Sequence, residues 1–368
     1  MFNGRSMPIR SSFFPGEVWR DTSGVAINAH GGGMLHHEEK YYWFGEHKIE
    51  GKEGNCAQVG VHVYSSADLY NWQDEGIALS VSDDPAHDIT KGCILERPKV
   101  IYNALTGKFV MWFHLEIKQS GYASARCGVA VADSATGPYR FIRSFRPNAG
   151  VWPRNVPEQD RCLLGDQELA FLDSLGMVGG PVPDYPANLV YRRDFTGGQM
   201  ARDMTLFVDE DGSAYHIHAS EDNETLHISQ LSDDYLSPAG CYSRFFPGRF
   251  HEAPSLMKHG GTYYLITSGC TGWEPNAARL SKADSLWGPW TEMGNPCQGP
   301  SEQMARTFDS QSTYILPVAG RPDAFIFMAD RWCPLNAIDG RYVWLPIRFK
   351  EQVPFLQWEK EWSLDSFG

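Results

Sequence analysis

Residues 251–273 read HEAPSLMKHGGTYYLITSGCTGW. Two apolar or aromatic runs flank Gly260 and Gly261, a pattern typical of a β-hairpin because glycine readily adopts the left-handed backbone of a tight turn. The same order of apolar strand, polar turn and aromatic or β-branched strand recurs at four other places, namely residues 30–48, 96–116, 202–221 and 311–332. A phrase that recurs along a chain indicates a repeat architecture.

A second unit follows each copy, consisting of another strand and a turn that leads to an aromatic or proline-rich segment. These units are residues 59–72, 127–141, 226–238, 277–290 and 341–358. Two hairpin-like units per repeat give four strands, and neighbouring sheets can bury each other's faces. We therefore predict an all-β fold, a five-bladed β-propeller whose blades are four-stranded antiparallel sheets, with residues 1–368 as one domain. A β-sandwich or two smaller β domains are the alternatives, but neither explains the recurrence.

The repeat pattern stops between Tyr139 and Gly198. This stretch is rich in proline, glycine and charged residues. We predict a long insertion between the second and third blades, at about residues 140–200. Loops of this length are uncommon, so the insertion is expected to be either a lid or rim over one end of the propeller or a surface pad without chemistry.

Composition narrows the choice of partners. The 368 residues include 32 Lys plus Arg and 45 Asp plus Glu, which gives a net charge of −13. This balance argues against nucleic acid and against an anionic membrane as partners. The 8 cysteines are scattered without a C-x-x-C pair, which disfavours a zinc site or a disulfide framework. Aromatic residues make up 13% of the chain, and flat rings can cover the C–H faces of a sugar.

The N-terminal residues have no apolar core of signal-peptide length, and no run of about 18 apolar residues occurs. The sequence as given predicts a cytoplasmic protein, or a secreted or periplasmic one if a signal has been removed.

The repeats place one polar residue at the start of each first strand. The innermost strands of a propeller run along its axis, so we expect these residues to converge at one end of it. Strand ends are often polar, which alone accounts for some of them. Charges gathered in one pocket are costly unless they are paired or used, so we infer an ion network or an active site. The five residues are His30, Glu96, Arg202, Glu252 and Gln311.

A pocket that contains both Glu96 and Glu252 suits the cleavage of a glycosidic bond. In that reaction one protonated acid donates to the leaving oxygen, while a group on the opposite side activates water.

The sequence resembles glycoside hydrolase family 43, whose members are five-bladed propellers. The resemblance runs from about Trp19 to the last repeat and suggests the branch that contains exo-acting β-1,3-galactanases and related galactosidases. It implies an inverting, exo-acting hydrolase that releases terminal galactose from β-1,3-linked galactan or arabinogalactan-type side chains. Five phrases in order carry it: INAHGGGMLHHEEKYYWFGEHK, ERPKVIYNALTGKFVMWFH, RDMTLFVDEDGSAYHI, HEAPSLMKHGGTYYLITSGCTGW and FDSQSTYILPV.

The resemblance assigns catalytic roles to the two glutamates. Glu252, in the phrase E-A-P-S, matches the general acid of the family. Glu96, in E-R-P-K, matches a carboxylate that orients the acid and tunes its pKa. Repulsion between two carboxylates would help to keep Glu252 protonated near neutral pH.

The catalytic base departs from the family pattern. Most members carry an Asp at the start of the first repeat, whereas no carboxylate lies between positions 28 and 36 here. In the galactanase-like branch a Gln holds the nucleophilic water or acts as an unusual base in its imidic-acid form, and Gln311 matches it. His30 and Asp309 are kept as substitutes for the base.

Other matches concern sugar binding. Glu46, Tyr122, Asp203 and Asn223 resemble residues that hydrogen-bond the hydroxyls of the terminal sugar, with His30 as a further candidate. Trp273 is a candidate platform for the C–H face of a galactose unit. Each has a structural alternative: Tyr122 and Trp273 can pack between blades, and Asp203 can pair with Arg202.

Two other functions stay open. The same scaffold can act as an α-L-arabinofuranosidase, a β-xylosidase or a β-galactofuranosidase, since the fold does not choose the sugar. The missing Asp of the first repeat keeps a non-catalytic sugar-binding propeller open as well. We expect an oligosaccharide or polysaccharide partner and no required cofactor or bound metal. An axial calcium occurs in some relatives, but no oxygen-ligand loop is apparent in the spacing.

Overall fold

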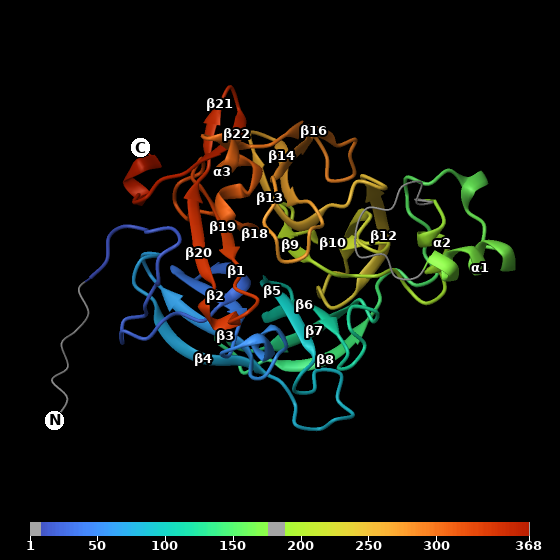
Figure 1. The fold of residues 1–368 in the computed structure, drawn as a ribbon, viewed down its shortest axis with the longest axis horizontal. Helices are drawn as coiled ribbons and strands as arrows, with labels where there is room; N and C mark the ends of the chain where they lie inside the picture. Colours follow the sequence, from blue (N-terminus) through green and yellow to red (C-terminus); the bar gives the residue numbers. More distant parts are fainter. Residues whose placement is uncertain (1–8, 176–187, 368) are drawn as a thin grey trace.

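The computed structural model describes residues 9–175 and 188–367, which form a β-propeller of six sheets (Figure 1). Four of the sheets have four antiparallel strands in chain order. The first is β1 (His30–His37), β2 (Lys40–Glu46), β3 (Gly60–Ser66) and β4 (Gln73–Ser80), and the second is β5 (Ile94–Asn103), β6 (Lys108–Glu116), β7 (Arg126–Ala132) and β8 (Arg140–Phe145). The third is β9 (Met204–Val208), β10 (Ala214–Ser220), β11 (Thr225–Leu231) and β12 (Pro238–Phe245), and the fourth is β13 (Glu252–His259), β14 (Thr262–Ser268), β15 (Arg279–Ala283) and β16 (Thr291–Gly294).

The prediction of five blades, each a four-stranded antiparallel sheet, is wrong. The described residues form six sheets, and two of them have three strands. The fifth sheet is β18 (Gln311–Pro317), β19 (Phe325–Arg331) and β20 (Arg341–Pro346), and the sixth is β17 (Cys297–Gln298), β22 (Val353–Gln357) and β21 (Arg348–Lys350).

The error lies in residues 341–358, which the repeat pattern treats as one unit of the last blade. Strand β20 ends at Pro346, and β21 and β22 form a separate hairpin. Strand β22 pairs in parallel with β17, from the connection that follows the fourth sheet. Proline cannot donate to a sheet ladder, and Pro346 accordingly ends β20, the edge strand of the fifth sheet.

The first strands of the sheets around the axis neighbour one another in a closed circle. Strand β1 contacts β5 on one side and β18 on the other, and β9 and β13 complete the circle. The sixth sheet lies at the periphery and packs on β20 (Figure 1). The starts of these inner strands therefore meet at one place, as a convergent site requires.

Aromatic side chains close the circle between the first and fifth sheets. Trp43 of β2 and Trp344 of β20 are each 1% exposed, and their ring centroids lie 4.7 Å apart. Trp19 and Trp72 pack edge-on against the same pair. Phe13 extends this cluster and forms a backbone bridge with Trp362. The seam between the first and fifth sheets is therefore an apolar contact.

The segment between β8 and β9 has no strand among its described residues. It contains the short helix η2 (Glu158–Asp160), α1 (Asp166–Leu175) and α2 (Val190–Arg193), and it projects beside β12 (Figure 1). Part of the expected insertion, residues 176–187, lies outside the described residues. Its role as a lid or rim and the assignment of the chain to one domain stay predictions.

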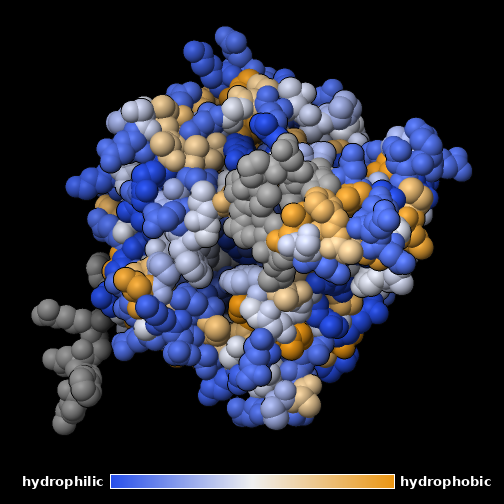
Figure 2. Space-filling model, turned by 45° about the vertical axis from the view of Figure 1, so that its right-hand side comes forward, coloured by the Kyte–Doolittle hydropathy of each residue, from blue (hydrophilic) through white to orange (hydrophobic). Residues whose placement is uncertain are grey.

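The surface visible in Figure 2 is largely hydrophilic, with hydrophobic residues in small groups. No helix within residues 9–175 and 188–367 has the length and apolar character needed to cross a membrane.

Replacing Trp344 by Ala should open the seam between the first and fifth sheets. A buried Trp to Ala change leaves a cavity and costs about 3 to 5 kcal/mol of unfolding free energy. Guanidinium denaturation measures the loss. Leu105→Ala is the control, since Leu105 is 78% exposed, and its unfolding midpoint should stay at the wild-type value. A Trp344→Ala midpoint equal to that of the control would contradict the role of the seam.

Candidate active site

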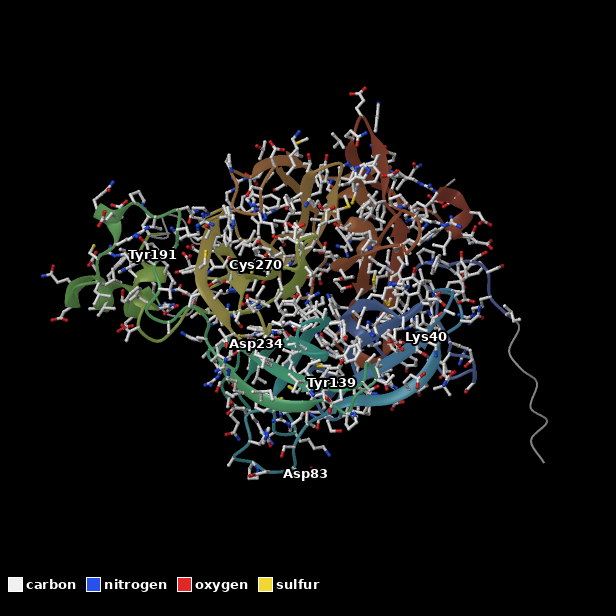
Figure 3. The ribbon with its side chains drawn as sticks, turned by 180° about the vertical axis from the view of Figure 1, so that it is seen from behind. Lys40, Asp83, Tyr139, Tyr191, Asp234 and Cys270 are labelled. Carbon is white, nitrogen blue, oxygen red and sulfur yellow. The ribbon has the colours of Figure 1, made fainter. Side chains whose placement is uncertain are left out.

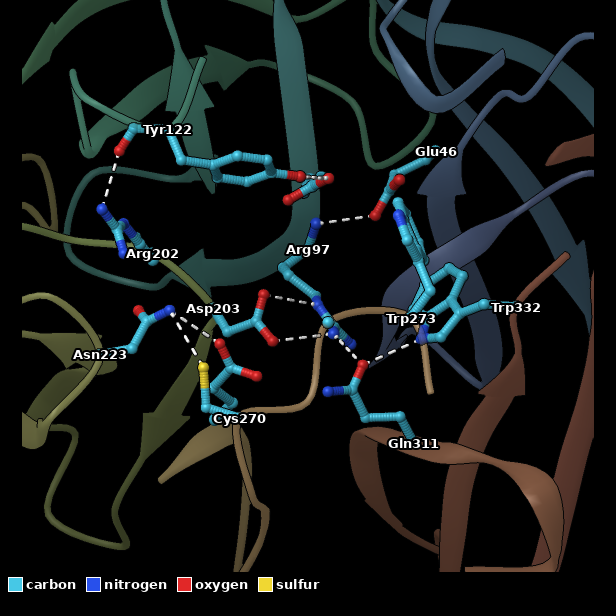
Figure 4. Close-up of a pocket in the computed structure, with 13 residues that line it drawn as sticks. Glu46, Arg97, Tyr122, Arg202, Asp203, Asn223, Cys270, Trp273, Gln311 and Trp332 are labelled. Carbon is cyan, nitrogen blue, oxygen red and sulfur yellow. Dashed lines mark hydrogen bonds and ion pairs between the residues drawn. The ribbon is translucent and has the colours of Figure 1, made fainter. Parts of the chain in front are cut away.

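A pocket of about 260 Å³ lies where the inner strands start. It contains all of the residues predicted from the sequence except His30 and Asp309. Trp273 is 40% exposed at its edge, while Arg97 is buried. The lining residues are Glu46, Glu96, Arg97, Tyr122, Arg202, Asp203, Asn223, Glu252, Cys270, Gly272, Trp273, Gln311 and Trp332 (Figure 4).

His30 and Asp309 are the two predicted residues that do not line the pocket. His30 is 1% exposed, its ring stacks on Tyr342, and Nδ1 lies 3.6 Å from Asp330 Oδ2. Asp309, kept as a substitute base, is bound to Arg306 Nε at 2.5 Å and lines a neighbouring cavity. Neither residue is placed to act on a molecule in this pocket.

A β-bulge lies at the start of each of three inner strands, and in two of them the polar residue, Glu96 or Glu252, lines the pocket. The pairing register shifts directly after His30, Glu96 and Glu252. A bulge inserts one unpaired residue, bends the strand and re-aims the adjacent side chains. The next residue has a left-handed φ in each strand, and these residues are Gly31 (62°), Arg97 (57°) and Ala253 (49°).

Gly31 is required by space as well as by conformation. A Cβ at this position would come within 2.1 Å of Glu46 Oε1. Glu46 Oε1 accepts a hydrogen bond from the backbone N–H of Arg97 at 3.0 Å, and Oε2 lies 2.6 Å from Lys48 Nζ. Glu46 is only 4% exposed, so its charge is balanced inside the protein by Lys48.

Arg97 links several sheets at the bottom of the pocket. Its guanidinium binds Asp203 in a bidentate manner, with Nε and Nη2 at 3.1 and 2.8 Å from the carboxylate oxygens. Nη1 donates to Ser312 O at 3.0 Å, and Nη2 also donates to Gln311 Oε1 at 2.6 Å. Burial acts to lower the pKa of Arg97, but Asp203 and Glu46 together raise it, so the side chain is charged.

Lys99 fills the axis below Arg97. It is 1% exposed, and Nζ donates to Gly31 O and Arg97 O at 3.2 Å each. A Cβ at Gly33 would come within 2.4 Å of Lys99 Cδ, so the side chain is closely packed. Burial and the charge of Arg97 lower the pKa of Lys99 to about 7. The pocket therefore has a solid floor at this level.

Glu252 is a pocket carboxyl whose pKa is raised. Burial and the charge of Asp203 raise its pKa to about 7. Asn223 Nδ2 donates to Glu252 Oε1 at 2.8 Å and lies 3.8 Å from Cys270 Sγ (Figure 4). A carboxyl with a pKa near neutrality can serve as a general acid.

Glu96 has the opposite protonation state. Burial opposes its ionisation, but the hydrogen bond and charge of His114 lower its pKa to about 2. Tyr122 Oη donates to Glu96 Oε1 at 3.0 Å, and His114 Nδ1 lies 3.1 Å from Oε2. The other His114 nitrogen faces Glu116 at 2.9 Å. Burial acts to lower the pKa of His114, but these two carboxylates raise it to about 9, so His114 is an imidazolium.

Gln311 is held by donors on one side and by a hydroxyl on the other. Its Oε1 accepts from Arg97 Nη2 at 2.6 Å and from Trp332 Nε1 at 2.9 Å, while Nε2 lies 3.0 Å from Ser268 Oγ. Arginine and tryptophan can only donate, so Oε1 must be an unprotonated acceptor. This network fixes Gln311 as an ordinary amide with one Nε2 hydrogen left for the pocket.

The group Glu96, His114 and Asp203 has its potential ligand atoms within 4.8 Å of one another. A histidine ligand must present an unprotonated nitrogen to the metal. Both nitrogens of His114 face carboxylates, and Asp203 is bound to Arg97. These three residues do not fit a metal ion, and the expectation that no cofactor is needed stays a prediction.

Arg97, Cys270 and Trp332 line the pocket but were not predicted from the sequence. Arg97 follows Glu96 directly, so strand alternation places it on the opposite face unless a bulge intervenes. Trp332 follows the second strand of the last repeat just as Trp273 follows that of the fourth, and the two rings meet edge-on at 5.9 Å. The matching positions of the two tryptophans in their repeats could have identified Trp332 as a pocket residue.

Comparison with known proteins identifies the family. Residues 186–314 match the model of glycosyl hydrolases family 43. A β-1,3-galactosidase of that family, solved with galactodeoxynojirimycin, is 52% identical with a TM-score of 0.89, over 96% of this chain and 100% of the other. An exo-β-1,3-galactanase from Clostridium thermocellum is 36% identical with a TM-score of 0.75, over 96% of this chain and 66% of the other.

A β-xylosidase from Bacillus subtilis (strain 168) is 28% identical over 193 residues, or 44% of this chain and 35% of the relative. The chain spans about a third of the length of the curated relatives it matches. The chain belongs to glycoside hydrolase family 43. The family resemblance seen in the sequence is confirmed.

Arg97→Met should lower the stability of the protein strongly. The substitution leaves Asp203 with no bidentate partner in a half-buried site, and breaking such a pair costs about 3 to 5 kcal/mol. Urea unfolding measures the loss. Arg249→Met is the control, because Arg249 pairs with Glu292 at the surface and such pairs contribute about 0 to 1 kcal/mol. Equal losses in the two variants would contradict a special role for Arg97.

Proposed function

We propose that the protein is an inverting, exo-acting glycoside hydrolase that releases terminal galactose from β-1,3-linked galactan or arabinogalactan-type side chains. The observation that carries the proposal is a pocket with a protonated glutamic acid, Glu252, and an ionised one, Glu96. Inverting hydrolysis needs a proton donor for the leaving oxygen and an acceptor near the attacking water. The two similar enzymes with β-1,3-galactose activity support the choice of sugar.

Glu252 acts as the general acid in this proposal. Its pKa of about 7 keeps a large fraction protonated at neutral pH, and its carboxyl faces the pocket beside Asn223. The unpaired Oδ1 of Asn223 is buried and can accept a hydrogen bond from a sugar hydroxyl. Trp273 offers an exposed ring at the edge of the pocket for the next sugar unit.

Asp203, rather than Glu96, is the residue that tunes the acid. The charge of Asp203 is the largest electrostatic cause of the raised pKa of Glu252, after burial. The bidentate contact with Arg97 fixes the Asp203 carboxylate in place. This differs from the role that the sequence resemblance gives to Glu96.

Gln311 positions the water but does not take its proton. Both donors to its Oε1 hold it in the amide form, so only the remaining Nε2 hydrogen can contact a water oxygen. Glu96 is the ionised pocket carboxylate that is bound by neither Arg97 nor Lys48, and it accepts the proton. Because its pKa is about 2, this carboxylate is ionised at neutral pH and has lone pairs to accept a proton.

The test of the proposed function is the release of monosaccharide from a set of substrates. The set is β-1,3-galactobiose, debranched arabinogalactan and the nitrophenyl glycosides of galactopyranose, galactofuranose, arabinofuranose and xylose. Galactose should appear from the β-1,3-linked substrates with the anomeric configuration inverted. Glu252→Gln should lower kcat on galactobiose by about 100-fold or more, since general acid catalysis contributes 10²- to 10⁴-fold.

Glu210→Gln is the matched control, since Glu210 is an exposed surface carboxylate on the β9–β10 turn, and it should keep wild-type activity. Release of another sugar would reject galactose as the substrate. Binding of galactan without release of any sugar would show a sugar-binding protein instead of an enzyme.

The pH profile should report the pKa of Glu252. The acid must be protonated, so kcat/KM should be constant at lower pH and fall as the pH rises through about 7. Asp203→Asn removes the neighbouring negative charge, lowers the pKa of Glu252 and moves this fall to lower pH. Asp211→Asn, at an exposed position of the same turn, should leave it unchanged. A fall that stays in place in Asp203→Asn would refute the tuning role.

A further inference from the structure

Three consecutive residues with left-handed backbone present Asn223 to Glu252. The turn between β10 and β11 contains Glu221, Asp222 and Asn223, whose φ angles are 53°, 58° and 71°. Each non-glycine residue in this conformation costs about 1 kcal/mol or more unless its surroundings hold it. The shape of this turn must therefore be imposed by contacts that its side chains make.

The first of these contacts is a buried ion pair. Glu221 is 0% exposed, and its oxygens accept from Arg244 Nε at 2.8 Å and Nη2 at 2.6 Å. His227 Nε2 lies 2.6 Å from Glu221 Oε1. The Arg244 guanidinium in turn lies over the ring of Tyr191, at 4.3 Å from its centroid.

The second contact reaches the turn from α2. Arg193 Nη1 donates to Asp222 Oδ2 at 3.2 Å, and Asp222 is 1% exposed. Arg193 is itself held by a bidentate pair with Asp194, at 2.8 and 2.9 Å. Fixed at its other side by Asp194, the guanidinium of Arg193 is a rigid support for the turn.

Both contacts involve the outlying segment between β8 and β9. Tyr191 and Arg193 belong to α2, and Asn155 exchanges two hydrogen bonds with the backbone of Arg244, at 2.6 and 3.1 Å. Figure 3 shows Tyr191 in this outlying segment and Cys270 nearer the middle of the molecule. None of residues 146–175 or 188–201 lines the pocket. Among the described residues of the segment, Tyr191 and Arg193 reach the site through the turn.

We propose that Arg193 is a positioning residue for catalysis: by holding Asp222 it fixes the turn from which Asn223 donates to Glu252. The inference rests on the proposed function of Glu252 as the general acid. The part of the segment between β8 and β9 that contains α2 then supports the turn, and the turn keeps the Glu252 carboxyl oriented toward the leaving oxygen. Cleavage of a substrate whose leaving group needs no proton would not depend on this positioning.

Comparison of two substrates tests this inference. β-1,3-Galactobiose has a leaving group that needs a proton, whereas the leaving group of 2,4-dinitrophenyl β-galactopyranoside does not. Arg193→Met should lower kcat on galactobiose about 10-fold, with less than about a 2-fold change on the aryl galactoside and in both KM values. Arg193→Lys should recover part of the loss.

Arg192→Met is the matched control, because Arg192 is in the same helix but binds Glu168 and the backbone at positions 162 and 163. It should keep both activities within about 2-fold of wild type. Equal losses of Arg193→Met on both substrates, or no loss on either, would overturn the inference. If Arg193→Met does not fold, Asp222→Asn removes the same ion pair and carries the same expectations.

A second measurement separates this inference from the proposed function. NMR titration of Glu252 needs no turnover, and loss of the Asn223 donor should raise the pKa of its carboxyl in Arg193→Met. Wild-type protein that cleaves no glycoside would refute the proposed function, and a raised pKa would still support the positioning role. A pKa of Glu252 equal to that of wild type in Arg193→Met would overturn the positioning role, whatever the activity.

Discussion

The buried guanidinium of Arg97 is the interaction on which the site depends. Arg97 belongs to the second sheet, its guanidinium binds the start of the third sheet and the fifth sheet, and the backbone N–H of the same residue donates to Glu46 of the first. Because its carboxylate partner is Asp203, the same contact that joins the sheets also fixes the charge that keeps Glu252 protonated. The Arg97–Asp203 ion pair therefore serves both the packing of the sheets and the pKa of Glu252, so a substitution in the pair affects both.

The pocket separates two glutamates that have the same intrinsic acidity. Glu96 lies beside an imidazolium that is itself held between two carboxylates, so its negative charge is stabilised. Glu252 is buried and has a carboxylate neighbour, so its proton is retained. Environment alone therefore divides the roles of acid and acceptor.

The repeat pattern predicted where the polar residues would meet, because inner strands of a propeller must start at one end of its axis. It could not predict the inward aim of Arg97, which depends on a bulge and a left-handed φ that no local rule requires of an arginine. The same pattern aligned His30 with Glu96, yet the His30 ring is buried against Tyr342. Sequence spacing locates a backbone position, whereas packing decides the direction of the side chain.

The number of sheets was out of reach for a related reason. Strand β22 finds its partner β17 more than 50 residues earlier in the chain and in parallel, and β17 is only two residues long. Local periodicity contains no signal for such a short, distant pair. Residues 341–358 resemble the second unit of the other repeats because they have the same apolar and aromatic composition.

Lys99 gives the proposed reaction a particular order of events. Its buried side chain packs against Gly31, Gly33 and Arg97, so the cavity is closed on this side. A galactose cut from the end of a chain would be trapped behind the remaining polymer until that polymer has withdrawn. Every bond cleaved would then require a complete departure and a new encounter. A population of galactan chains would shorten together, rather than a few being consumed while the rest stay intact.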